Sequence, residues 1–568
     1  MIMKNEIKKR LDGNFLKNNL KTNWLYVLSS IALIAVFTPW YAHIVVMGIG
    51  MFLFQFVFTV LFQVAVFSQI SFITDNVKKT GRSIKTVSAV STFGICCFQM
   101  ADRISAVVRY RDKIQSFASR FMSSFAWDVC MLFNIAIVAL SLLAGIIVYA
   151  LTVMLLHTVA EQLREPFDSF SKTEKWVYAV ITAVIIGFVC VSFFIGGAFW
   201  GKEDRLDVLF TSDTSILVQE NAYMTLMHSE NDLRQPLFAV FAAPFVGFGY
   251  AVSVPFSFLS PVVTPLMMNI VQVLMLMAGH LMLADMLSSD PRKRICVMLV
   301  TSATYTTTLF SLMMEQYIVC YFWLMFAVYS AVKKHKSSGL SICACGGTLL
   351  TGMSLLPLVH DYSDKKRSAL RYTAVEAGKC LSLFVVLLLS FGRIDVILSM
   401  FVQTKSLSRF AGGNGFWVRI RQYLSFISSC FAAPETKLVN DNSLQLSENN
   451  YLNISLLGVI ILILCLAGIL LNKRDKLTVI SGLWICFSFL ILAVIGWGSV
   501  ENGEILYSLY FSWAFVVLIF RLVEWVSDKL GSVWFTVIFS GLLTAALCAW
   551  NNNGIKDLWD FASVCYPV

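Results

Sequence analysis

The sequence of 568 residues is poor in charge. Only 14% of its residues are Asp, Glu, Lys or Arg, whereas 58% are hydrophobic. This composition excludes a water-soluble protein of the same length, which would need a largely polar surface. Mean hydropathy is +0.73. Because a helix that crosses a bilayer needs about 20 largely uncharged residues, we expect an all-α, polytopic transmembrane helical bundle of about 12–14 spans.

Other features are also missing. The 14 Cys include no CxxC pair of the kind that binds metal, and most of them fall within apolar segments. Only Cys430 and Cys565 are expected to be exposed. No cleavable signal peptide is evident, and no internal repeat of the kind found in pseudo-symmetric transporters. The net charge of +10 is attributed to cytoplasmic Lys and Arg, so no nucleic-acid partner is expected.

Charged loops and apolar segments divide the chain into four parts. These are a basic arm with extra membrane helices (1–170), a catalytic membrane module (171–400), an outer basic and aromatic loop (401–451) and C-terminal transmembrane helices (452–568). Residues 71–128 are rich in Lys and Arg, and we expect them on the cytoplasmic surface. The alternatives are that residues 86–101 dip into the membrane or that a neighbouring loop is external.

One polar stretch, residues 200–236, lies between apolar segments. Its acids are Glu203, Asp204, Asp207, Asp213, Glu220, Glu230 and Asp232, against the basic residues Lys202, Arg205 and Arg234. A membrane protein does not need an acidic loop here for solubility, so we interpret this loop as the candidate active site. Following the basic loops along the chain places it on the outer face, together with Glu315, residues 392–451 and Glu504.

The loop resembles that of the GT-C superfamily of polytopic glycosyltransferases, which includes protein O-mannosyltransferases and the aminoarabinose transferase of lipid A. In that family an outer loop carries an essential acidic residue and ends at a proline-led helix. The matching residues are Asp213, in Phe-Thr-Ser-Asp-Thr, and Pro236, in Leu-Arg-Gln-Pro-Leu-Phe. Glu315 and Glu504 match later outer acidic positions. The resemblance covers residues 176–526, although a single Pro replaces the usual pair.

The resemblance implies transfer of a sugar from a polyprenyl-phosphate donor, with inversion, to an acceptor on the extracytoplasmic face. Such a reaction needs a carboxylate that takes the proton of the acceptor hydroxyl, and a cation that stabilises the leaving phosphate. Asp213 is the predicted base, Asp207 its alternate, and Glu315 a further catalytic acid. Asp213 and Glu315 are also the predicted ligands of a divalent cation, Mg²⁺ or Mn²⁺. Alternatively, Asp213 caps a helix and Glu315 lies in a solvated turn.

Predicted substrate-binding residues come from three stretches of the outer face. They are His228, Glu230, Asp232, Arg234, Glu504, Arg409, Arg419 and Arg421. The Arg side chains suit bidentate contact with a phosphate. Two alternatives remain open: residues 228–234 form a polar lid, and residues 392–451 form an amphipathic helix on anionic lipid.

These predictions define the expected partners: a polyprenyl-phosphate sugar donor, a glycan, lipid or protein acceptor, and the lipid bilayer. The expected location is a bacterial inner membrane, with the active site facing outside. Two other functions remain open. An O-antigen-ligase-like or polymerase-like enzyme would depend on the Arg residues of 392–451. A transporter or flippase of lipid-linked glycans would need polar residues within the spans, and most of the spans are apolar.

Overall fold

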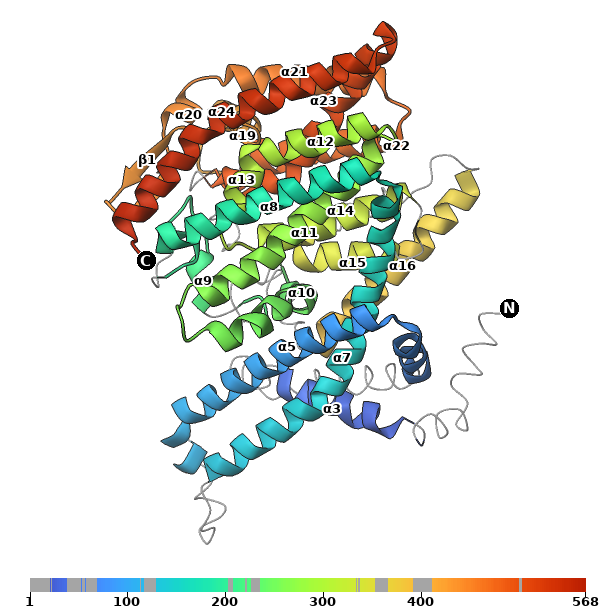
Figure 1. Ribbon diagram of the computed structural model, residues 1–568, viewed down its shortest axis with the longest axis vertical. Coiled ribbons are helices and arrows are strands. Elements are labelled where there is room, and N and C mark those ends of the chain that lie inside the picture. Colours follow the sequence, from blue (N-terminus) through green and yellow to red (C-terminus); the bar gives the residue numbers. More distant parts are fainter. Residues whose placement is uncertain are drawn as a thin grey trace. The chain divides into compact units, whose positions relative to one another are not determined.

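The computed structural model is almost entirely helical (Figure 1). It describes residues 21, 23–37, 53, 57, 69–112, 114–116, 129–202, 208–219, 222–225, 235–333, 335, 338–352, 366–391, 411–499 and 503–568. Within these residues, 8 helices are long and apolar enough to cross a membrane, or up to 9 if one bent pair counts as a span. An integral, multi-pass membrane protein is therefore indicated, with the helical architecture that composition predicted. The expected total of spans includes residues outside this described set and stays a prediction.

The chain forms two compact units that interleave along the sequence. The first comprises Met1–Glu161, Ala222–Phe256 and Leu381–Ser399, and the second comprises Gln162–Asn221, Ser257–Cys380 and Met400–Val568. The predicted catalytic module, residues 171–400, is thus divided between the two units. Two helices, α7 (Val129–Ser169) and α16 (Lys366–Ser390), pass from one unit into the other.

In the first unit, α5 (Arg82–Arg109) packs against α10 (Phe238–Ser253), and α3 (Trp24–Phe37) also contributes. Ser91 Oγ donates a hydrogen bond to the carbonyl of Pro244 at 2.7 Å, and Gly94 lies directly against the carbonyl of Gly247. Helix α5 is one of the helices long and apolar enough to cross a membrane, which favours the alternative that residues 86–101 enter the membrane over a purely surface location. Its basic residues lie near its two ends and leave an uncharged centre.

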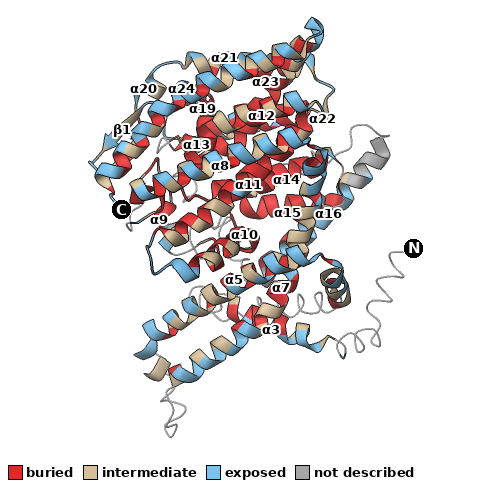
Figure 2. Cartoon of the chain, viewed as in Figure 1, coloured by how far each residue is buried: buried red, intermediate tan, exposed pale blue. Residues whose placement is uncertain are grey.

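The short helix η3 (Val254–Phe256) also belongs to the first unit, and the second unit contains the other elements. They are α8 (Lys172–Ile195), η1 (Gly197–Phe199), α9 (Thr214–Gln219), α11 (Val263–Leu287), α12 (Pro291–Ala303), α13 (Tyr305–Leu312), α14 (Tyr317–Val332), α15 (Ser338–Thr348), α19 (Phe416–Ser429), β1 (Thr436–Val439), β2 (Ser443–Leu446), α20 (Asn449–Leu452), α21 (Leu456–Leu471), α22 (Lys476–Ser488), η5 (Phe489–Ile495), η6 (Glu504–Tyr507), α23 (Ser508–Leu530) and α24 (Val533–Cys565). Figure 2 shows buried residues concentrated on α11, α14 and the helices around them. Large side chains such as Trp323 and Trp513 fill this core.

Local sequence explains where several of these helices begin. Ser171 and Glu174 form a capping box at the start of α8. Asp290 caps α12, and Pro291 occupies its first turn, where a missing N–H is tolerated. Thr304 ends α12 and caps α13, and the two helices are bent by 58° at this point. The break leaves α13 pointing towards the turn that carries Glu315.

One end of the second unit holds a buried ionic network, which we call the charged end. Arg294 pairs with Glu174 at 2.7 Å and with Asp285 at 3.4 Å, and Lys333 pairs with Asp285 at 2.9 Å. Here α8 and α12 begin, and α11 and α14 end. Helix α8 begins at the charged end and α14 ends there. The residues that follow α8 and the turn that precedes α14 therefore lie together at the opposite end of the unit. We call that the site end.

Candidate functional site

The loop after α8 is anchored by the C-terminal residues. The N–H of Gly197 donates to the carbonyl of Tyr566 at 2.6 Å, and Lys202 Nζ donates to the carbonyl of Pro567 at 2.7 Å. A side chain at Gly196 would come within 2.5 Å of Ala562 in α24, so glycine permits this close approach. The end of α24 therefore fixes where the loop starts.

The second part of the loop is held by the β1–β2 hairpin. Phe210 N–H donates to the carbonyl of Leu444, and Leu444 N–H donates to the carbonyl of Val208, both at 2.9 Å. Directly afterwards, Phe210 and Thr211 adopt φ values of 56° and 60°. This left-handed conformation is unfavourable for bulky and β-branched side chains. Backbone strain is thus stored immediately before Asp213.

Glu315 binds the backbone of the candidate base. Its Oε1 accepts a hydrogen bond from the N–H of Asp213 at 2.7 Å and from the hydroxyl of Thr214 at 3.2 Å. Its Oε2 accepts from the N–H of Gln316 at 3.3 Å. Glu315 is fully buried, so the alternative of a solvated turn does not hold. Two predicted catalytic acids, separated by a hundred residues in sequence, are therefore brought together.

The two acids differ in environment. Burial, followed by the neighbouring Asp213 carboxylate, raises the pKa of Glu315 to about 8, although the hydrogen-bond donors to its oxygens oppose this shift. Asp213 is half-buried, and its carbonyl accepts a hydrogen bond from Leu217 N–H at 3.1 Å. It therefore occupies the position just before α9, as expected of a capping residue. A capping position leaves its carboxylate compatible with a role as base.

Glu504 also lies at the site end of the second unit. It is 5% exposed, and among the described residues its Oε1 has no hydrogen-bond partner. A side-chain atom at Gly503 would lie 2.7 Å from Thr211 Oγ1, which places this turn beside the strained residues of the loop. The rings of Tyr317 and Tyr507, with centroids 6.4 Å apart, also join the turns of Glu315 and Glu504.

The two described arginines of the predicted phosphate site point to different places. Arg419 Nη1 donates to the carbonyl of Ile495 at 3.2 Å, and its side chain lies over Gly496 in the connection that leads to Glu504. Arg421 Nη1 donates to the carbonyl of Leu452 at 2.8 Å, on another side of α19. The side chains of Arg419 and Arg421 therefore do not converge on one phosphate site. Of the two, Arg419 is the one that contacts the segment before Glu504.

The other predicted site residues lie outside the described residues, and their roles stay predictions. They are Asp207, His228, Glu230, Asp232, Arg234 and Arg409.

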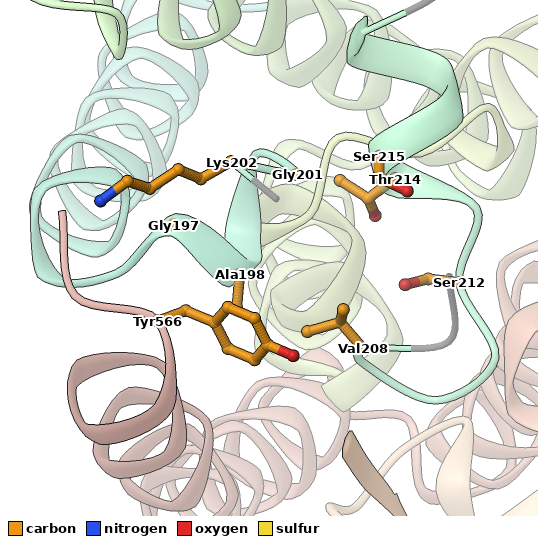
Figure 3. A pocket seen from close by; sticks show the side chains of 9 residues that line it. All are labelled: Gly197, Ala198, Gly201, Lys202, Val208, Ser212, Thr214, Ser215 and Tyr566. Carbon is orange, nitrogen blue, oxygen red and sulfur yellow. The ribbon is translucent and has the colours of Figure 1, made fainter. Parts of the chain in front are cut away.

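A small pocket opens on one side of the loop (Figure 3). Its empty volume is about 240 Å³, and hydroxyl groups of Ser212, Thr214 and Ser215 are among its lining groups. Tyr566 forms part of its wall, and the amine of Lys202 points away from these hydroxyls (Figure 3). Asp213 is not among the described residues that line it, so an acceptor activated by Asp213 would approach from elsewhere.

Two residues of this site could not be identified from the sequence. Tyr566 reaches the pocket through α24, and its hydroxyl donates to the carbonyl of Asn442 at 2.6 Å. The hairpin residue Leu444 supports the loop through its backbone alone. No local signal could have identified either residue, because both contacts join segments more than a hundred residues apart.

The predicted cation site has few ligands. Among the described residues there is no group of three or more His, Cys, Asp or Glu that could hold a metal ion. Three hydrogen-bond donors bind the two oxygens of Glu315, and only one of them binds Oε2. The cation site of Asp213 and Glu315 stays a prediction. All 14 cysteines are free, and Cys430 is buried rather than exposed as expected.

Comparisons with known proteins give no further guide. No protein-family model, curated protein or solved structure matches the chain. The class of protein that the fold defines is a helical, multi-pass membrane protein. Anything more specific depends on the geometry of the site end.

Proposed function

We propose that the chain is a membrane glycosyltransferase that transfers a sugar from a polyprenyl-phosphate donor to an acceptor hydroxyl. The acceptor is a glycan, a lipid or a protein, and transfer takes place on the outer face of a bacterial inner membrane. The observation that supports this proposal best is the pairing of Asp213 with Glu315. The buried carboxylate of Glu315 accepts a hydrogen bond from the backbone N–H of the half-buried Asp213, just before α9.

In the proposed reaction, the carboxylate of Asp213 takes the proton of the acceptor hydroxyl. The acceptor oxygen attacks the anomeric carbon, and the bond from that carbon to the phosphate oxygen breaks. The electron pair leaves with the polyprenyl phosphate, and the anomeric configuration is inverted. Glu315 acts as a positioning residue, because its contact is with the backbone N–H of Asp213.

Several features favour this assignment over a structural role for the loop. Its backbone is strained at Phe210 and Thr211, and such strain persists only where surrounding contacts fix it. Those contacts come from three separate segments: the C-terminal residues, the hairpin and the turn of Glu315. Arg419 is the described residue proposed to contact the donor phosphate, together with Arg234 and Arg409.

The test uses the full chain in lipid nanodiscs with a synthetic polyprenyl-phosphate hexose. Asp213→Asn keeps the N–H that binds Glu315 but removes the base, so transfer should fall by about 10²–10⁴-fold. Asp441→Asn makes the same change in the hairpin turn, outside the proposed machinery, and should leave transfer unchanged.

Full activity in Asp213→Asn would overturn the proposal. Loss of transfer in Arg419→Ala alone would instead favour the O-antigen-ligase-like or polymerase-like enzyme. Absence of transfer by the wild type, combined with movement of lipid-linked glycan across vesicles, would favour the flippase.

A further inference from the structure

Helix α19 presents two different faces. Trp417 and Arg421 are four residues apart and therefore lie on the same face of the helix. Trp417 is 74% exposed, and its ring meets that of Phe416 edge to face at 5.6 Å. The opposite face carries Arg419 and Gln422, which reach residues 495–499 by hydrogen bonds. In the part of the chain that the structure describes, the hydrogen bond of Arg421 goes instead to Leu452.

This face continues into the start of α21. Arg421 donates to the carbonyl of Leu452, and the following residues Ile454 and Leu456 are 66% and 72% exposed. Further along α21, Ile463 and Leu470 are also exposed, as on a helix that faces lipid. Helix α19 crosses α21 in its first turn, where the carbonyl of Leu424 lies directly against Gly458. Helix α19 therefore lies beside the first turn of the apolar helix α21.

Among the described residues no carboxylate pairs with the basic side chain of this face. Helix α19 contains no acidic residue, and in the described parts of the chain Arg421 forms no ion pair. Lys437, at the same end of the unit, does pair with Glu448 at 2.8 Å. Arg421 uses one N–H for a backbone carbonyl, and its guanidinium has further N–H donors that suit a phosphate.

We infer that Phe416, Trp417, Arg421, Ile454 and Leu456 form a binding site for the headgroup of an anionic membrane phospholipid. Arg421 contacts the lipid phosphate, and the two aromatic rings lie at the boundary between headgroups and acyl chains. Aromatic residues beside a basic residue are typical of that boundary. The exposed apolar rim matches the lipid's acyl chains, which a free phosphate lacks. This site is separate from the proposed donor site and does not depend on the proposed function.

The experiment uses the full wild-type chain in nanodiscs that contain a photoactivatable phosphatidylglycerol. Adducts are mapped by peptide mass spectrometry to residues 411–458. The wild type should be labelled there, and Arg421→Gln should be labelled about fivefold less, since one arginine at an anionic surface contributes roughly that factor. Lys437→Gln, a matched loss of charge at a paired residue, should be labelled like the wild type.

Three results would overturn the inference. One is equal labelling in Arg421→Gln and the wild type. Another is equal labelling by the matching phosphatidylcholine probe, which would mean that the headgroup charge is not recognised. The third is competition by millimolar inorganic phosphate, which would indicate a free-anion site. If Arg421→Gln does not fold, Trp417→Ala decides the question: its side chain is largely exposed, and unchanged labelling in this variant would refute the site.

Discussion

Replacing Glu315 with Gln should remove the contribution of Glu315 to the loss of stability that the wild-type chain shows as pH rises from about 5.5 to about 7.5. The pKa of Glu315 is raised to about 8 in the folded protein by burial and by Asp213. In the unfolded chain this carboxyl has its ordinary pKa near 4.3. Between these two values the unfolded state releases the proton while the folded state retains it. The folded state is therefore favoured at low pH, and stability falls as pH rises.

The size of the effect follows from linkage. A difference of one bound proton changes the free energy of unfolding by about 1.4 kcal/mol per pH unit. Over the two units of the window, Glu315 should therefore account for a loss of about 2 to 3 kcal/mol. Gln has no proton to release, so the slope in Glu315→Gln should be smaller than that of the wild type by about 1.4 kcal/mol per pH unit. The amide also faces the N–H of Gln316, which adds a destabilisation that does not vary with pH.

The assay is denaturant unfolding of the full chain in mixed micelles at several pH values, with the slope of stability against pH as the readout. Glu448→Gln is the control. Lys437 holds the pKa of Glu448 below its usual range, so its contribution is already complete above pH 5 and should leave the slope unchanged. A slope in Glu315→Gln equal to that of the wild type would refute the assignment of the raised pKa to this residue.

Two further variants test how the second unit is held together. Arg294→Ala should lower the free energy of unfolding by about 3–5 kcal/mol, because Glu174 would be left buried without its partner. A loss below about 1 kcal/mol in denaturant unfolding would contradict this. Gly458→Ala should cost about 1–3 kcal/mol, since the new methyl group meets the carbonyl of Leu424 and pushes α19 from α21. An unchanged unfolding midpoint would show that these helices separate easily.

Helix boundaries were most predictable where charge marks them. Helix α14 occupies Tyr317–Val332, an uncharged segment delimited by Lys333 and the turn of Glu315. For α5 the charges near its two ends left two readings open, a surface segment or a segment that enters the membrane, because the centre between them is uncharged. Charge near an apolar segment therefore locates ends well but does not exclude a helix that crosses between them.

The site was predictable only as a set of residue types on one face. The acids Asp213, Glu315 and Glu504 do lie at the same end of the second unit. The sequence could not reveal that Glu315 binds the N–H of Asp213 rather than a side chain, since a backbone donor is present at every residue except proline. The support from Tyr566 depends on how α24 packs along α8, which is a tertiary property.

Among the residues that the structure describes, buried acidic residues form ion pairs at one end of the second unit but not at the other, and this contrast bears on function. At the charged end, Glu174 and Asp285 are each paired with a cation, Arg294 or Lys333. At the site end, Glu315 and Glu504 are equally buried, yet in the described part of the chain neither forms an ion pair. An unpaired buried acid is costly, and this protein pairs its acids where only structure requires them. The unpaired acids are thus compatible with the proposed site, in which Glu315 positions Asp213.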